Sequence, residues 1–143
     1  MMKRAAIAFL LLALATSCLG GLGCGGADTP EQVADKFVQA MLDEDGDAAW
    51  AVVTEASKEG ISKEELVEGG SEGIEGYTMG DASVAGDEAR VMTSFTLTGL
   101  DKPMEFDMVL FKEGGGWKVS LADTQTEIEK SLEALLEELG IQQ

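Results

Sequence analysis

The chain has 143 residues, of which 27 are acidic and 10 are basic, and its formal net charge at pH 7 is −17. This charge disfavours nucleic acids and anionic lipid surfaces as direct partners. The chain has no histidine, which excludes Ser-His-Asp and Cys-His catalytic systems and histidine-based metal sites within it. Its length suits one domain with a hydrophobic core rather than two domains.

The N-terminus has the pattern of an export signal. Residues 1–4 (MMKR) are basic, and residues 5–15 (AAIAFLLLALA) form an apolar run that is followed by small residues and glycines. A secretory signal peptide has this order, whereas a helix that spans a membrane needs about 20 consecutive apolar residues. We therefore expect an exported protein.

Both cysteines, Cys18 and Cys24, follow this apolar run directly. The segment resembles the lipobox of bacterial lipoproteins, in which small residues precede a cysteine that is lipidated and becomes the new N-terminus. Residues 1–17 are removed if Cys18 is lipidated, and residues 1–23 if Cys24 is. A further alternative is an ordinary cleaved signal in which the cysteines have no role.

Lipidation would decide where the protein works. Two or more acyl chains give a stable membrane anchor, whereas one chain binds only marginally. The protein would then be held in the bacterial cell envelope, facing the periplasm or the cell surface. Residues 18–28 are rich in glycine and would form a flexible tether between the lipid and the folded domain.

A first amphipathic helix is predicted over residues 30–42. Thr29 is a good N-cap, Pro30 suits the first helical position, and Gln32 completes a capping box with Thr29. Apolar residues then recur at helical spacing. The residues of this stripe are Val33, Ala34, Phe37, Val38, Met41 and Leu42.

Two shorter helices are predicted to follow. Residues 47–56 (DAAWAVVTEA) form the first of them, with Asp47 as the N-cap and with Trp50 and Val53 buried. The second begins after Ser62, which stands three residues before a glutamate and therefore starts another capping box.

From residue 77 onward the apolar residues alternate with a period of two, which predicts successive antiparallel strands. The alternating segments are residues 77–84, 88–98, 103–113 and 116–121. Short turns separate them at residues 85–88, 99–103 and 113–116. Helices followed by a meander predict an α+β fold, in which the N-terminal helices pack on one face of a curved antiparallel sheet.

The segments TPE at residue 29, AAW at residue 48, GYTMGDASVAGDEARVMTSFTL at residue 76 and GGGWKVSL at residue 114 occur in a characteristic order. This order resembles the nuclear transport factor 2-like superfamily, and most closely its small bacterial lipoproteins of uncharacterised function. The resemblance covers residues 29–122. It implies a cone in which helices and a strongly bent sheet enclose a pocket. Members include enzymes, ligand-binding proteins and dimers, so the fold alone does not give the function.

Residues 123–143 extend beyond this family core and predict an amphipathic helix. Thr124 and Glu127 have the spacing of a capping box, and Gly140 stands where a C-cap glycine belongs. One face carries the apolar residues Ile128, Leu132, Leu135, Leu136 and Leu139. We expect this stripe to pack on the same domain, over the cone mouth or the open sheet face, in preference to binding a partner. The acidic polar face disfavours adsorption to a membrane.

The acidic segment DEDGD at residues 43–47 has the alternating spacing of the first three calcium ligands of an EF-hand. Ala48 and Thr54 stand where that loop needs its glycine and its bidentate glutamate. We interpret the segment as a turn between helices, with Gly46 near the C-cap. No metal site and no cofactor are predicted.

An enzyme is the alternative function, because the superfamily includes ketosteroid isomerase, which works with a pocket carboxylate as base. Asp107 and Tyr77 are the candidates that this resemblance suggests. A desolvated Asp107 would have a raised pKa suited to proton abstraction. No family motif matches either residue, so no catalytic residue is predicted.

The favoured function is a non-enzymatic module that binds a small apolar molecule or another protein. The residues placed to line a cone are Phe37, Trp50, Phe95, Met104 and Phe106. For the interaction function, Met92, Val109 and Phe111 would form an exposed apolar patch that pairs two copies or docks an envelope protein. A filled interior favours interaction, an open apolar cavity favours a ligand, and a cavity holding Asp107 beside Tyr77 favours catalysis.

Overall fold

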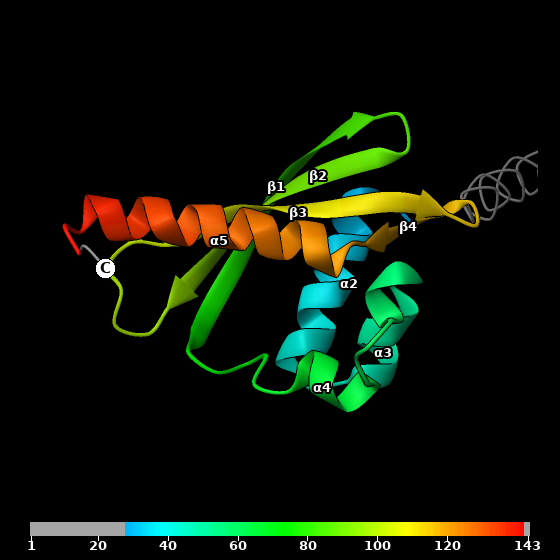
Figure 1. The fold of residues 1–143 in the computed structure, drawn as a ribbon, viewed down its shortest axis with the longest axis horizontal. Coiled ribbons are helices and arrows are strands. Elements are labelled where there is room, and N and C mark those ends of the chain that lie inside the picture. Colours follow the sequence, from blue (N-terminus) through cyan, green and yellow to red (C-terminus); the bar gives the residue numbers. More distant parts are fainter. Residues whose placement is uncertain (1–27, 142–143) are drawn as a thin grey trace, which may run out of the picture.

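The computed structural model describes residues 28–141 and places three helices against a curved four-stranded antiparallel sheet, with a long helix at the C-terminal end (Figure 1). The helices before the sheet are α2 (Pro30–Leu42), α3 (Gly46–Ala51) and α4 (Lys63–Val67), with one 3-10 turn, η1 (Ala56–Lys58). The strands are β1 (Ile74–Ala85), β2 (Glu88–Leu97), β3 (Met104–Glu113) and β4 (Gly116–Val119), and the last helix is α5 (Leu121–Glu138).

The predicted signal peptide, both cysteines and most of the tether fall on residues 1–27, which lie outside the described residues. Within residues 28–141, no helix has the length and apolar content that crossing a membrane requires.

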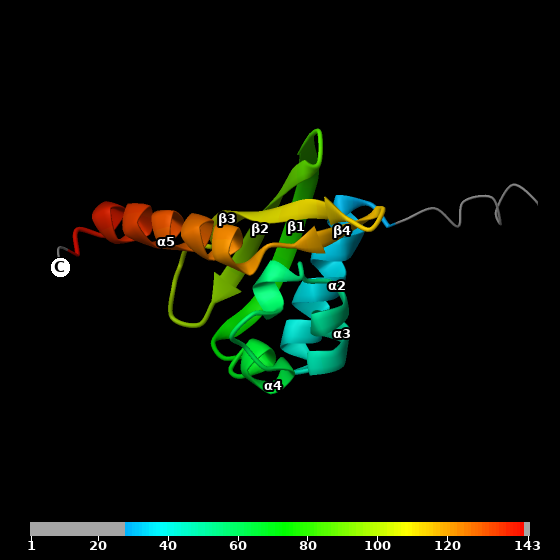
Figure 2. The same ribbon diagram turned by 45° about the vertical axis from the view of Figure 1, so that its right-hand side comes forward.

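The sheet confirms the predicted α+β fold and meander. Its strand order is β1-β2-β3-β4, and every neighbouring pair is antiparallel. Alternate residues of β2 point to the concave inner face, where Ala89, Val91 and Thr93 are fully buried. A bulge between Met79 and Ala82 interrupts the pairing of β1, and bulges of this kind bend a strand. Figure 2 shows the resulting curl of the sheet around the helices.

Helix α2 forms as predicted and supplies the main helical contact with the inner face of the sheet. The Thr29 hydroxyl accepts a hydrogen bond from the backbone N–H of Gln32 at 3.3 Å, and the Gln32 side chain accepts one from the N–H of Thr29 at 2.9 Å. This capping box starts the helix where the sequence places it. The buried face is made of Val33, Ala34, Phe37, Val38 and Ala40.

Helix α3 is shorter than predicted and begins earlier. Its N-cap is Asp45 rather than Asp47, because the Asp45 carboxylate accepts a hydrogen bond from the Ala48 N–H at 3.0 Å. Asp47 instead pairs with Lys63 of α4 at 2.6 Å. The helix ends before Val53, whose backbone forms a bridge with Val119 of β4. Pairing with an edge strand therefore ends the helix that the sequence continues to residue 56.

The turn at residues 43–47 joins α2 to α3, but Gly46 is not its C-cap glycine. Glu44 takes the left-handed conformation after α2, with φ of 54°. The Asp45 N–H donates to the Ala40 carbonyl, and the Glu44 N–H donates to the Met41 carbonyl, which is the pattern of a Schellman motif. Gly46 begins α3, where a β-carbon would stand 2.7 Å from the Lys63 carbonyl oxygen. Among residues 28–141 no cluster of three acidic or cysteine side chains could hold a metal ion.

Helix α5 also begins earlier than predicted, at Leu121 with Ser120 as N-cap, so Thr124 and Glu127 form no capping box. The helix starts directly where β4 ends, which places Thr124 inside its first turns. The predicted glycine cap is confirmed. Gly140 has φ of 70°, and the Ile141 N–H donates to the Leu136 carbonyl.

The two Schellman motifs predict that a substitution to glycine stabilises one of them and that a substitution away from glycine destabilises the other. A non-glycine residue in the left-handed region costs roughly 1–2 kcal/mol. Glycine also raises the conformational entropy of the unfolded chain, which offsets part of the gain. Glu44→Gly should therefore raise the free energy of unfolding by up to about 1 kcal/mol. Gly140→Ala should lower it by about 1 kcal/mol. Urea unfolding of both variants measures these changes. A loss of stability in Glu44→Gly would contradict the assignment.

Candidate functional site

Helix α5 takes the place of a missing strand beside β3. Strand β4 pairs only with Leu110–Glu113, so the preceding part of β3 has an open edge. Helix α5 runs along this edge in both views (Figures 1 and 2). The Thr124 hydroxyl accepts a hydrogen bond from the Val109 N–H at 3.0 Å, and the Ser120 N–H donates to the Val109 carbonyl at 2.8 Å. Both backbone polar groups of Val109, which is only 1% exposed, are therefore satisfied.

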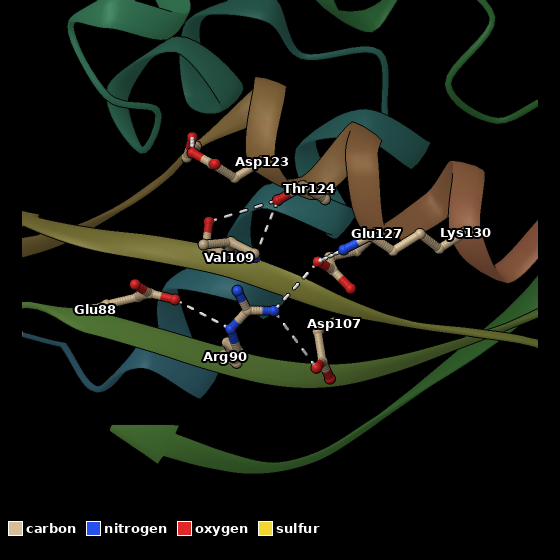
Figure 3. Close-up of polar contacts among 9 residues, drawn as sticks. Glu88, Arg90, Asp107, Val109, Asp123, Thr124, Glu127 and Lys130 are labelled. Atoms are coloured by element: carbon tan, nitrogen blue, oxygen red, sulfur yellow. Dashed lines mark hydrogen bonds and ion pairs between the residues drawn. The ribbon is translucent and has the colours of Figure 1, made fainter. Parts of the chain in front are cut away.

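A group of charged side chains links one side of α5 to the outer face of the sheet (Figure 3). Arg90 of β2 lies 3.0 Å from Glu88, 3.3 Å from Glu127 of α5 and 4.0 Å from Asp107 of β3. Lys130 contacts Glu127 from the next turn of the helix at 2.9 Å. Because the Arg90 side chain is 42% exposed, each of its pairs contributes at most about 1 kcal/mol. Among these pairs of Arg90, the one with Glu127 joins the sheet to α5.

The pKa values in this group follow from the same contacts. The Lys130 ammonium, and after it the Arg90 guanidinium, lowers the pKa of Glu127 below its ordinary value. Hydrogen bonds to Glu127 and then to Glu88 raise the pKa of Arg90. Both residues are therefore charged at neutral pH, and neither is a candidate for proton transfer.

A small apolar cavity lies on the opposite side of α5, between α2 and the inner face of the sheet. Its volume is about 130 Å³. The lining residues are Phe37, Val38, Met41, Leu42, Gly70, Phe95, Phe106, Met108, Thr124 and Ile128. Thr124 carries the only polar side chain among them, and its hydroxyl is occupied by Val109. Most ligand pockets measure about 300–1,000 Å³, so this cavity has room for one small apolar group.

The structure brings together three of the five residues predicted to line the cone. Phe37, Phe95 and Phe106 line the cavity, and the rings of Phe95 and Phe106 meet edge to face with centroids 5.2 Å apart. Trp50 and Met104 are packed against the core but lie outside the lining. Trp50 instead has the Lys58 ammonium 5.7 Å from its ring centroid.

Several other lining residues were not predicted from the sequence, among them Met41, Leu42 and Ile128. The first two belong to the apolar stripe predicted for α2, one turn beyond Phe37 and Val38, so their spacing carried the signal. Ile128 enters the cavity because α5 docks along the β3 edge. A contact between a C-terminal helix and a strand edge has no signature in the sequence.

Asp107 and Tyr77 lie on opposite faces of the sheet. Tyr77 is paired across the strands with Phe95 on the inner face, whereas Asp107 is paired with Met92 on the outer face. The Tyr77 hydroxyl donates to Asp35 at 2.7 Å and accepts a hydrogen bond from the Gln39 amide. Desolvation, followed by the bond to Asp35, raises the pKa of Tyr77. No site that combines the two side chains is formed.

The predicted apolar patch on the outer face is also not formed. Met92 is 54% exposed, but Val109 is buried under α5 and Phe111 is half-buried. The patch is interrupted because the helix covers the edge of β3 at its centre. Met92 is left as a single exposed side chain, which is ordinary on a protein surface.

A larger group of exposed apolar residues lies on the second half of α5 and on the residues that follow it. We define the distal stripe as Leu132, Leu136, Leu139 and Ile141. Leu132, Leu139 and Ile141 are 44%, 50% and 54% exposed, and Leu136 is half-buried. Figure 1 shows this end of α5 (red) extending beyond the sheet. The expected packing of the helix on its own domain therefore holds for the first half, where Thr124 and Ile128 contact the core, and ends there.

An acidic row runs beside the distal stripe. It consists of Glu129, Glu133 and Glu137, spaced four residues apart and all exposed. A shallow groove along α5 is lined by this row together with Leu132, Leu136 and Ile141. An exposed ion pair joins Glu138 at this end of the helix to Lys102 in the loop between β2 and β3. The second half of α5 thus presents apolar and acidic side chains together to solvent.

The contact between Thr124 and Val109 can be tested by an isosteric change. Thr124→Val keeps the shape of the side chain but leaves the buried Val109 N–H without a partner, so it should lower the free energy of unfolding by about 1–3 kcal/mol. Thr126→Val is the matched control on the exposed side of the same helix, with an expected change within about 0.5 kcal/mol. Equal urea midpoints for the two variants would show that the hydroxyl does not hold α5 on β3.

Several solved structures are similar to this chain. A protein of Campylobacter jejuni described as an NTF2-like transpeptidase has a TM-score of 0.51 and 14% identity, over 66% of this chain and 99% of that chain. An NTF2-like protein of unknown function from Silicibacter pomeroyi has 19% identity over 62% of this chain and 86% of its own, with a TM-score of 0.44. An epoxide hydrolase from M. tuberculosis has 16% identity over 74% of this chain and 93% of its own, with a TM-score of 0.36.

At these identities the Campylobacter structure shows a shared fold and nothing about activity. None of the curated proteins matches the chain. The sequence model of a family described as the NTF2-like N-terminal transpeptidase domain matches residues 29–134, which is most of the chain. The match includes all four strands and most of α5, so the C-terminal helix lies largely within the family unit. The chain belongs to this family of NTF2-like domains.

Proposed function

We propose that this protein is a lipid-anchored protein of the bacterial envelope whose NTF2-like domain binds another protein through the distal stripe of α5. The observation that carries the proposal is the contrast between the two halves of this helix. The first half is packed on the core, whereas the second half exposes apolar residues that do not belong to the core cluster or to the residues packed against it. Exposed apolar clusters with a polar rim are typical of protein interaction sites.

The filled interior supports protein binding over small-molecule binding. The inner cavity of about 130 Å³ is well below the usual size of a ligand pocket. It also supports a non-enzymatic function, because no acidic or basic side chain lines it. A general acid or base must lie within hydrogen-bond reach of a bound substrate, and Asp107 and Tyr77 do not share a site here.

The arrangement of the chain suits a membrane anchor at the N-terminus. The start of α2 (blue) and the free end of α5 (red) lie at opposite ends of the domain in both views (Figures 1 and 2). A domain tethered through residues 18–28 would therefore hold the distal stripe away from its attachment point. A partner could reach this surface without displacing the anchor.

Lipidation can be tested with the two cysteines separately. In bacteria fed with labelled palmitate, either Cys18→Ala or Cys24→Ala should abolish incorporation of the label, and the other variant should remain labelled. The cysteine whose loss removes the label fixes the cleavage frame. Label that persists in both single variants and in the double variant would contradict the proposed anchor.

The interaction surface can be tested by photo-crosslinking in cells. A benzoylphenylalanine placed at Leu132 or Leu139 should give an adduct with a different protein. Val84 is the matched control, because it is similarly exposed at 55% but lies in the β1–β2 hairpin. Adducts at all three positions in equal yield, or no adduct at Leu132 and Leu139, would rule out the distal stripe as the binding surface.

A further inference from the structure

The chemistry of the distal stripe restricts the kind of partner that it can bind. Successive residues of a helix are separated by about 100° around its axis. With this spacing, acidic residues lie on both sides of the stripe. The acidic row of Glu129, Glu133 and Glu137 follows one side, and Glu138 lies on the other. Lys130 is the only basic residue in the whole of α5.

The acidic row is not neutralised by its own domain. Within residues 28–141, no lysine or arginine forms an ion pair with Glu129, Glu133 or Glu137, whereas Glu127 and Glu138 of the same helix are paired. Placing three like charges at intervals of four residues is unfavourable for an isolated helix. A partner that brought positive charge to this row would relieve that repulsion.

The apolar part of the surface begins one helical turn after the residue of α5 that lines the cavity. Ile128, which closes the cavity from the side of α5, is one helical turn before Leu132, where the groove along the helix begins. A partner helix aligned with α5 could cover the stripe with side chains spaced at i, i+4 and i+7.

We propose that the partner segment is a cationic amphipathic helix, with leucine-like residues on the distal stripe and lysine or arginine opposite the acidic row. The inference rests on the proposed function, because it names the partner class for the same surface. A second copy of this chain is disfavoured, since its own acidic row would face this one and like charges in an interface oppose association. An anionic membrane is disfavoured for the same reason.

The test uses the full chain in a neutral detergent and two 18-residue helical peptides with the same leucine positions. The remaining positions are mainly lysine in one peptide and mainly glutamate in the other. Fluorescence anisotropy should show saturable binding of the Leu-Lys peptide to one site and no binding of the Leu-Glu peptide. The affinity for the Leu-Lys peptide should fall as salt is added, because exposed charges are screened.

Two triple variants with the same change in net charge separate a specific site from general attraction to an acidic protein. The first replaces the acidic row by Glu129→Gln, Glu133→Gln and Glu137→Gln. The control replaces exposed acids elsewhere by Glu59→Gln, Glu72→Gln and Glu75→Gln. We expect the first variant to weaken binding at least tenfold and the control to change it less than twofold. Circular dichroism of both variants checks that α5 is retained.

Equal weakening in the two variants, equal binding of the two peptides, or no binding of the Leu-Lys peptide would each overturn the inference. These outcomes differ from a failure of the proposed function. If photo-crosslinks form at Leu132 and Leu139 while the Leu-Lys peptide fails to bind, the surface binds a protein of other chemistry. If the crosslinks are absent, the interaction function itself is wrong, whatever the peptides do.

Discussion

The arrangement of the domain depends on how the open edge of β3 is covered. Strand β4 is only four residues long, so it leaves Val109 at the boundary between a paired and an unpaired edge. An unpaired edge exposes backbone groups that can pair with another chain. Here the chain turns at Ser120 and a helix begins at once. The Thr124 hydroxyl accepts the hydrogen bond from the Val109 N–H that the carbonyl of a neighbouring strand would have accepted. This side-chain hydrogen bond attaches α5 to the open edge of β3.

The positions of the outer-face ion pair, the cavity and the distal stripe follow from the attachment of α5 to the edge of β3. A helix seated on an edge has one side over each face of the sheet. Glu127 therefore meets Arg90 on the outer face, while Ile128 closes the cavity on the inner face. The 18 residues of α5 extend past the end of the sheet, because nothing limits a helix to the length of the strand that it covers. The exposed second half is thus a geometric result of the first half being fixed.

The regular elements could be predicted from the sequence because their signals are local. The capping boxes at Thr29 and Ser62 and the alternation in β2 and β3 each depend on neighbouring residues. The errors arise where a distant contact decides. Val53 leaves its helix to bridge Val119, and Thr124 was assigned as a cap because its bond to Val109 cannot be seen in the sequence. The apolar face of α5 was visible, but the point at which its packing ends depends on the length of β4.

Substitutions in the two halves of α5 differ in how strongly they affect folding. Substitutions in most parts of a small domain alter stability and recognition together, since the same side chains serve both. Beyond Ile128, the side chains of α5 contribute little to the core, so they can be exchanged with small effects on folding. New binding preferences could accumulate on this segment while the sheet and α2 stay the same. Related domains would then share an architecture and differ in the chemistry of their last helical turns.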